Sequence, residues 1–229
     1  MSDCEEMVAT GSSSGSGWSA VVCVSASSWE LSGSWELSGA LFERACSLPD
    51  AADIVTFDDA APPAGSTPWV GGVPEAERIE IAPSDPRWPQ TFAQLSMLII
   101  DALGEQALGV EHVGSTAVPG LPAKPIIDID LTVPDVTDEP SWLPHLEASG
   151  FVLRVREPWW YEHRCLRLDR PRCNLHVFPA DCPEVARHRI FRDWLRQSSE
   201  DLALYRDAKL AAAGATNEKG EGVQDYNAR

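Results

Sequence analysis

The stretch that decides the fold covers residues 111–131 and reads EHVGSTAVPGLPAKPIIDIDL. Near its end, Asp128 and Asp130 stand two positions apart in an apolar, β-rich run, residues 126–133, bounded by prolines. Residues two apart in an extended strand project from the same face, so the two carboxylates share a face. The other face carries the apolar side chains of the run: Ile127, Ile129, Leu131 and Val133. The pattern predicts a strand with one apolar face and one acidic face.

Two neighbouring carboxylates on a rigid strand repel one another, which costs stability unless a cation lies between them. Their hard oxygen atoms suit Mg²⁺ or Mn²⁺, which would also bridge phosphate oxygens. Asp128 and Asp130 are therefore candidate metal ligands. From this pair alone, an edge strand whose acids face water is the simpler alternative.

The residues upstream of the acidic pair favour a phosphate ligand. Gly114 and Ser115 follow a short β-like run, residues 110–113, and 12 residues separate Ser115 from Asp128. A glycine lets backbone N–H groups approach a phosphate closely, and the serine hydroxyl adds a donor. This arrangement resembles the pattern of polymerase-β-type nucleotidyltransferases, in which Gly-Ser holds the triphosphate and the acidic pair holds the metals.

The resemblance extends to one family. The runs HVGSTAVPGL (112–121) and AKPIIDI (123–129) are similar to the signature of the GrpB-like nucleotidyltransferases. The blocks EHR (162–164), NLHVF (174–178), FRDWLR (191–196) and YRDAK (205–209) follow in the family's order. The resemblance covers residues 78–229 and implies a nucleotidyltransferase-like fold of the α+β class, a mixed sheet flanked by helices. Some relatives are fused to dephospho-coenzyme A kinase, which indicates a metabolic context and not an activity.

Nucleotidyltransferases usually supply a third carboxylate from a neighbouring strand, and the expected strand here, residues 174–178, carries none. If Asn174 and His176 point toward the acidic pair, a histidine takes the place of the third acid. His176 could then ligate a metal or act as a general base, or it could be an ordinary hydrogen-bonded histidine of the sheet. Glu162 is the other acid close enough in sequence to contribute.

Phosphate binding also requires positive charge near the acids. Lys124, inside the family motif, is the first candidate, and Arg164, in the EHR block, is the second. Arg167 lies an odd number of residues from Arg164 on the same expected strand, so at most one of the two faces the site. His163 is a further candidate polar group, and His112 could orient the Gly-Ser loop or contact phosphate.

The C-terminal region is predicted to be helical over residues 183–213, with a break near residues 197–200. Ser198, followed three residues later by Asp201, is a plausible start of the second helix. Three basic residues of this region recur at helical spacing and could contact phosphate, although a solvated charged face is the simpler interpretation: Arg192, Arg196 and Lys209. His188, between Arg187 and Arg189, is interpreted as part of a charged helix face.

The remaining secondary structure follows from periodicity and from turn residues. We expect a strand at 78–82 and helices at 88–108 and 141–149. Further strands are expected at 151–155, 164–168 and 174–178.

The N-terminal third of the chain has a different composition. Residues 1–77 hold 12 acids and one base, whereas the whole 229-residue chain has a formal charge of −17. They include a serine-rich run and a tandem repeat, SWELSG at 28–33 and 34–39. This composition predicts a low-complexity, disordered extension that ends in a linker at 60–77, followed by one domain at 78–229. A tryptophan-containing acidic docking segment is the alternative.

Composition excludes several classes of protein. The acidic balance argues against coating of nucleic acid, no apolar run is long enough to cross a membrane, and no secretory signal is recognisable. Six cysteines without a CxxC pair favour reduced thiols and a cytoplasmic location. The last residues, VQDYNAR (223–229), match a family block that usually continues into another helix, so we expect a truncated C-terminus.

These inferences predict an enzyme that uses Mg²⁺ or Mn²⁺ to move a nucleotidyl group from a nucleoside triphosphate to an unidentified small acceptor. A nucleotide- or phosphate-binding module of the same fold that transfers nothing is the first alternative. A non-functional fragment is the second. The sequence does not distinguish among the three.

Overall fold

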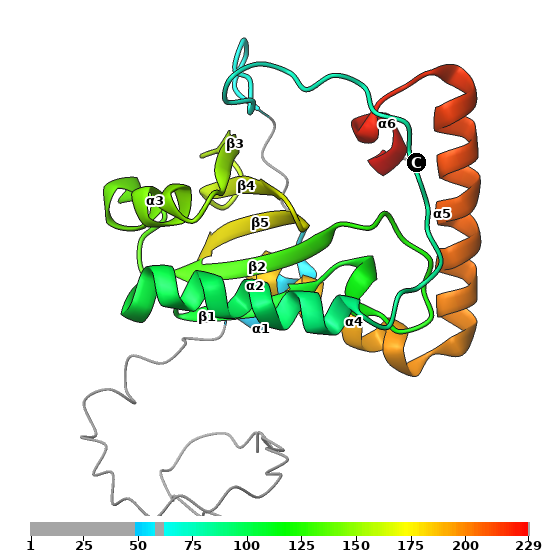
Figure 1. Cartoon of the computed structure of the whole chain (residues 1–229), viewed down its shortest axis with the longest axis horizontal. Helices are drawn as coiled ribbons and strands as arrows, with labels where there is room; N and C mark the ends of the chain where they lie inside the picture. Colours follow the sequence, from blue (N-terminus) through cyan, green and yellow to red (C-terminus); the bar gives the residue numbers. More distant parts are fainter. Residues whose placement is uncertain (1–48, 58–61, 229) are drawn as a thin grey trace, which may run out of the picture. The chain divides into compact units, whose positions relative to one another are not determined.

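A mixed five-stranded sheet lies at the centre of the computed structural model, which describes residues 49–57 and 62–228 (Figure 1). Its strands are β1 (Gly109–Val113), β2 (Ile127–Val133), β3 (Val152–Glu157), β4 (His163–Asp169) and β5 (Arg172–Pro179), in the spatial order β1-β2-β5-β4-β3. β2 and β5 run parallel, and the other neighbours are antiparallel. The expected α+β class is confirmed. The serine-rich part of the predicted extension, residues 1–48, lies outside the described residues.

The strand register decides which side chains share a face of the sheet. Asp128 lies opposite Asn174 and Asp130 opposite His176, so all four side chains belong to one face. We call this side of the sheet the polar face. The expectation that Asn174 and His176 share a face with the acidic pair is therefore correct.

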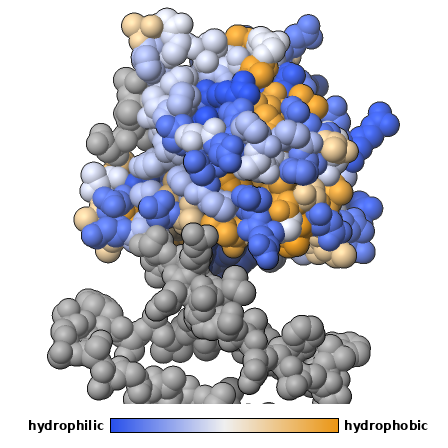
Figure 2. All heavy atoms as spheres, turned by 90° about the vertical axis from the view of Figure 1, so that its left-hand side faces the viewer, coloured by the Kyte–Doolittle hydropathy of each residue, from blue (hydrophilic) through white to orange (hydrophobic). Residues whose placement is uncertain are grey.

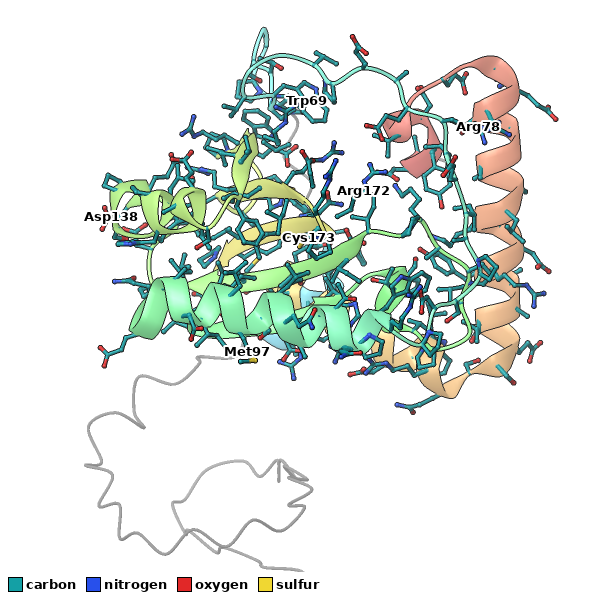
Figure 3. The ribbon with its side chains drawn as sticks, viewed as in Figure 1. Trp69, Arg78, Met97, Asp138, Arg172 and Cys173 are labelled. Carbon is teal, nitrogen blue, oxygen red and sulfur yellow. The ribbon has the colours of Figure 1, made fainter. Side chains whose placement is uncertain are left out.

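The opposite face is apolar and is covered by α2 (Trp88–Leu103) and α3 (Glu139–Ala148). The central buried side chains of this layer are Ile99, Ile129, Leu131, Trp142, Leu146, Leu166 and Leu175. α2 is shorter than predicted because Gly104, with φ +55°, ends it before a short 3₁₀ turn. Its outer side exposes Met97, labelled in Figure 3, and polar and apolar side chains mix over the end of the molecule that Figure 2 shows.

The helical C-terminal region divides where the sequence predicts. α4 (Pro183–Gln197) and α5 (Ser199–Lys219) are separated by Ser198, whose Oγ accepts a hydrogen bond from the Asp201 N–H at 3.3 Å. A short helix, α6 (Val223–Asn227), then turns back beside α5 (Figure 1). Within the described ranges, no helix is both long and apolar enough to cross a membrane.

The prediction of a strand at residues 78–82 is wrong. This segment is extended, but its one bridge is the isolated pair of Ala82 with Ala123. The Asn217 side chain of α5 takes the place of a neighbouring strand. Its Oδ1 accepts from the Ile79 N–H at 2.8 Å, and its Nδ2 donates to the Ile79 carbonyl at 2.9 Å.

The stretch predicted as a linker also contacts the sheet. The Val70 N–H donates to the Arg154 carbonyl at 2.9 Å, and the Arg156 N–H donates to the Pro68 carbonyl at 2.8 Å. Trp69 therefore pairs with Val155 at the outer edge of β3. An amino acid composition rich in proline and glycine does not reveal this edge pairing, which depends on β3 being the last strand of the sheet.

Replacement of Asn217 by alanine tests this attachment. Asn217→Ala leaves the N–H and carbonyl of Ile79, a 5% exposed residue, without their partners. We expect a loss of about 1–3 kcal/mol in the free energy of unfolding, measured by urea denaturation. The neighbouring exposed residue provides the control, Glu218→Ala. Equal losses in the two variants would contradict the attachment.

Candidate functional site

Of the two carboxylates of β2, Asp130 lies in a region that excludes water, whereas Asp128 is partly exposed. Asp130 is 1% exposed, and burial raises the pKa of both Asp128 and Asp130. Asp128 Oδ1 accepts a hydrogen bond from Asn174 Nδ2 at 2.8 Å, and Asp130 Oδ2 accepts from His188 Nδ1 at 2.8 Å. Asp130 Oδ1 is buried and has no hydrogen-bond partner among the described residues. One buried acceptor of this pair is therefore available to a ligand.

His188 of α4 compensates the charge of Asp130. Burial alone would lower the pKa of His188, but hydrogen bonds to Asp130 and Glu184 outweigh it and raise this pKa to about 10. The ring is therefore a cation at neutral pH, with its Nε2 3.4 Å from Glu184 Oε1. The interpretation of His188 as part of a charged helix face did not include this contact with Asp130. The spacing of Glu184 and His188, one helical turn apart, was the available signal.

The Gly-Ser loop packs directly on the first carboxylate. Gly114 has φ +68°, and a Cβ added to it would lie 2.7 Å from Asp128 Oδ2. Only glycine allows the backbone to approach Asp128 this closely. Ser115 then starts a 3₁₀ turn, Ser115–Ala117.

Two lysines converge beside this loop. Lys209 Nζ, from α5, donates to Ser115 Oγ at 2.8 Å, and Lys124 Nζ lies 4.9 Å from the centre of the Tyr226 ring. Burial and the charge of Lys124 lower the pKa of Lys209 to about 8, against the opposing effect of Asp128. Tyr226 Oη is buried without a partner among the described residues. An anion placed here would satisfy both ammonium groups and this hydroxyl.

Two arginines of α4 hold the loop by its backbone. Arg192 Nη1 donates to the His112 carbonyl at 2.9 Å and to Glu111 Oε2 at 3.0 Å. Arg196 Nη2 donates to the Ala117 carbonyl at 2.8 Å. Arg192, with a side-chain exposure of 12%, and Lys209 do not lie on the solvated face that helical spacing suggested, whereas the Arg196 side chain is 40% exposed and also pairs with Asp193.

His112 supports the loop from the apolar side of the sheet. Its ring stacks on Phe92 with centroids 4.7 Å apart, and its Nε2 lies 3.1 Å from Thr116 Oγ1. Burial, followed by the charges of Arg196 and Arg192, lowers the pKa of His112 to about 4. Of the two roles considered for His112, the structure supports orientation of the loop and not contact with phosphate.

A chain of three polar side chains reaches the site from β3. Glu157 Oε2 lies 2.8 Å from His163 Nδ1, and His163 Nε2 lies 3.0 Å from His176 Nδ1. Burial lowers the pKa of His176 well below its ordinary value, so this ring is neutral. Because a carboxylate accepts only, His163 Nδ1 carries the proton toward Glu157. When both rings are neutral, His176 Nδ1 then donates to His163, and His176 Nε2 keeps a lone pair.

The structure does not bring Arg164 to the site. Arg164 is opposite Val177 in the register and therefore lies on the apolar side of the sheet, where its Nε donates to Glu139 Oε1 of α3 at 2.7 Å. It is 6% exposed and cannot reach phosphate on the polar face. Glu162 is 3.5 Å from the Arg164 Nη1 atom, so it belongs to the same ion-pair group and does not supply the third acid.

A cavity of about 560 Å³ opens over the polar face beside Asn174 and His176. Trp69, Arg78 and Arg172, all labelled in Figure 3, lie around it and come from three separate segments. Lys124 also lines this cavity, which therefore extends from the lysine pair across β5. The polar face thus has room for a small molecule.

The donor atoms of the polar face suit a hard divalent cation. Within residues 49–57 and 62–228, no three His, Cys, Asp or Glu side chains are grouped as a ready metal site. Nevertheless, Asp128 and Asp130 supply carboxylate oxygens, and Asp130 Oδ1 is an unpartnered buried acceptor. The residues present therefore fit Mg²⁺ or Mn²⁺.

Comparison with known proteins places the chain in a family. Residues 78–229 match the family described as GrpB protein. The chain belongs to the GrpB family. This GrpB protein is 48% identical to UPF0157 protein BH1888 of Halalkalibacterium halodurans over 140 residues, 61% of this chain and 72% of the relative. It is 44% identical to UPF0157 protein SCO7215 of Streptomyces coelicolor over 142 residues, 62% of this chain and 74% of the relative.

Two other similarities extend the comparison. A protein of Mycolicibacterium paratuberculosis named dephospho-CoA kinase is 38% identical over 161 residues, which are 58% of this GrpB protein but 39% of the kinase. The crystal structure of the conserved protein GrpB from Enterococcus faecalis superposes with a TM-score of 0.57 and 28% identity, covering 64% of this chain and 88% of that one. The similarity to the solved GrpB structure confirms the fold and agrees with the family match.

Replacement of Gly114 by alanine tests the close approach of the loop. Gly114 and Gly120 both have positive φ, but only at Gly114 would a Cβ meet another residue within 4 Å. Gly120→Ala therefore measures the backbone strain alone, about 1–2 kcal/mol. Because its Cβ would overpack against Asp128, we expect Gly114→Ala to lower the free energy of unfolding, measured by urea denaturation, by about 1–3 kcal/mol more than Gly120→Ala does. Equal losses would show that the loop can move away from the carboxylate.

The depressed pKa of His112 predicts an acid-sensitive fold. Below pH 6.5 the unfolded chain binds a proton on His112 that the folded chain does not bind until about pH 4. Stability therefore falls as the pH drops through this window, by up to about 3 kcal/mol from this group. His112→Gln cannot titrate, so its unfolding free energy should fall less than that of the wild type between about pH 7 and pH 4.5. Parallel pH profiles would contradict a buried neutral His112.

Proposed function

We propose that this GrpB protein is a metal-dependent nucleotidyltransferase that moves a nucleotidyl group from a nucleoside triphosphate to a small acceptor. The observation that carries the proposal is the contact between Gly114 and the Asp128 carboxylate, with Lys209 bonded to Ser115. A phosphate-binding loop, two acids and a lysine thus meet on the polar face.

The triphosphate is assigned to the side of the site where positive charge is concentrated. Ser115, Lys124 and Lys209 would bind its outer phosphates, and Tyr226 Oη would donate to one of their oxygens. These groups surround the loop before any ligand arrives. Such preorganised positive groups stabilise phosphoryl transfer with little rearrangement.

Asp128 and Asp130 would hold Mg²⁺ or Mn²⁺, with Asn174 and His188 keeping the carboxylates in position. When bound, the cation supplies positive charge that offsets the charge of the transferring phosphate. The protein's own residues orient the donor and exclude water from Asp130, which is 1% exposed.

The acceptor would react beside His176. In the transfer, a bond forms between an acceptor oxygen and the α-phosphorus, the bond from that phosphorus to the α,β-bridging oxygen breaks, and pyrophosphate leaves. His176 Nε2 is available to take the proton of the acceptor hydroxyl, because its Nδ1 is bonded to His163.

One observation favours a second candidate, a binding module that transfers nothing. The His188 cation already compensates Asp130, so the site needs no metal to be stable. A protein of this kind would bind the nucleotide and keep it intact. The transfer assay below distinguishes the two candidates.

The Asp128→Asn/Asp130→Asn double variant tests transfer. Purified protein is incubated with each α-labelled nucleoside triphosphate, Mg²⁺ or Mn²⁺, and a metabolite extract. We expect the wild type to move label to a new species and the double variant to lose at least about a hundredfold in rate, the order expected when charge stabilisation is removed. Bound but untransferred nucleotide would favour the binding module, and absence of both binding and transfer in a folded protein would contradict both candidates.

Two lysines of α5, Lys209 and Lys219, provide a test of nucleotide binding and its matched control. Lys209→Gln removes a charge-assisted contact and should weaken triphosphate binding about tenfold to a hundredfold in calorimetric titration. Lys219→Gln, an exposed site at the end of the same helix, should leave the affinity unchanged.

A further inference from the structure

The polar face continues beyond the acids onto β4, where it carries Arg167. Arg167 lies opposite Asn174, and Asn174 lies opposite Asp128, so the three residues form a row across β4, β5 and β2. With strands about 4.8 Å apart, the backbone of Arg167 is about 10 Å from that of Asp128. Ser115 follows β1, on the other side of β2, so Lys209, which is bonded to Ser115, and Arg167 flank the acids from opposite sides, whereas Lys124 lines the same cavity as Arg167.

Arg167 is a cation without a matching anion in the described part of the chain. Its side chain lines the 560 Å³ cavity, is only partly exposed, and takes part in none of the ion pairs of this region. The planar guanidinium has five donors that match the oxygens of a carboxylate or phosphate. An unpaired guanidinium that faces a cavity therefore indicates a site for an anionic group of a ligand.

A second arginine, Arg172, supports an anion site at the position of Arg167. Arg172 lines the cavity as well and is bonded to Glu77 at 2.9 Å, with side-chain exposures of 47% and 65%. A surface pair of this kind contributes little stability, so Arg172 can exchange Glu77 for a ligand. Of the other acids at the cavity, Glu157 is bonded to His163, and the remaining two, Glu75 and Glu80, are exposed.

The cavity also has an apolar wall that could hold the body of a small molecule. Trp69 and Val155, paired at the edge of the sheet, lie on one side, and Pro125 and Ile126 lie on another. His176 is part of the floor. A molecule that fills the cavity would therefore present one end to His176 and the other to the arginines.

We propose that this cavity binds the acceptor and that the acceptor carries an anionic group, a carboxylate or phosphate, held by Arg167 and Arg172. The assignment of the ligand as the acceptor rests on the proposed nucleotidyl transfer. The anion subsite itself rests on the cavity and on the unpaired guanidinium. The enzyme would then join the nucleotide of the donor to a hydroxyl of a small acid.

Calorimetric titration with inorganic phosphate tests the subsite. To remove the donor's phosphate site, the titration uses the Lys209→Gln protein. We expect the Lys209→Gln protein to bind phosphate. Adding Arg167→Gln or Arg172→Gln to this protein should lower its affinity for phosphate at least tenfold. Arg189→Gln, an exposed arginine of α4, is the matched control and should change nothing. In the wild-type background, Arg167→Gln should leave the affinity for nucleoside triphosphates within twofold.

Three results would overturn the proposal, and each has a different meaning. Phosphate binding that does not respond to Arg167→Gln removes the subsite. Loss of triphosphate binding in Arg167→Gln assigns the arginine to the donor. Binding of phosphate through Arg167 in a wild-type protein that binds no triphosphate contradicts the proposed function and, with it, the assignment of an acceptor. Unchanged unfolding midpoints of the variants exclude misfolding as the cause.

Discussion

Two carboxylates on one face of the central strand, one of them fully buried, are the constraint on which the rest of this structure depends. Burial raises the pKa of Asp128 and Asp130, so each must be stabilised by neighbouring donors or cations to remain ionised. Asn174 stabilises the first and His188 the second. Asn174 and His188 lie 46 and 58 residues after the carboxylates that they stabilise, so the site depends on contacts between β2, β5 and α4.

Stabilisation of the two carboxylates by Asn174 and His188 leaves both hydrogen-bond acceptors and hydrogen-bond donors of the site free for a ligand. Asp130 Oδ1 and Tyr226 Oη are buried without partners among the described residues, while burial and the charge of Lys124 lower the pKa of Lys209. A protein optimised for stability alone would pair these groups. A metal-bound triphosphate would provide the missing acceptors and donors together, which supports the proposed function.

The periodicity of the sequence predicted much of this site, because strand alternation is a local property. Asp128, Asp130, Asn174 and His176 share a face as expected. The prediction that Arg164 contacts phosphate was wrong, because it rested on the family block. Strand alternation alone allowed either Arg164 or Arg167 to face the acids, and only the strand register shows which one does. Lys209 and His188 were missed because their partners lie 94 and 58 residues away, and the packing of α4 and α5 decides which helical face is buried.

The most direct measurement is anomalous scattering from a crystal soaked with Mn²⁺ and a non-hydrolysable nucleoside triphosphate. The account predicts a manganese peak beside the carboxylates of Asp128 and Asp130, with the outer phosphates against Ser115 and Lys209. An ordered triphosphate elsewhere on the protein, or phosphates at the loop without metal at the carboxylates, would contradict the account.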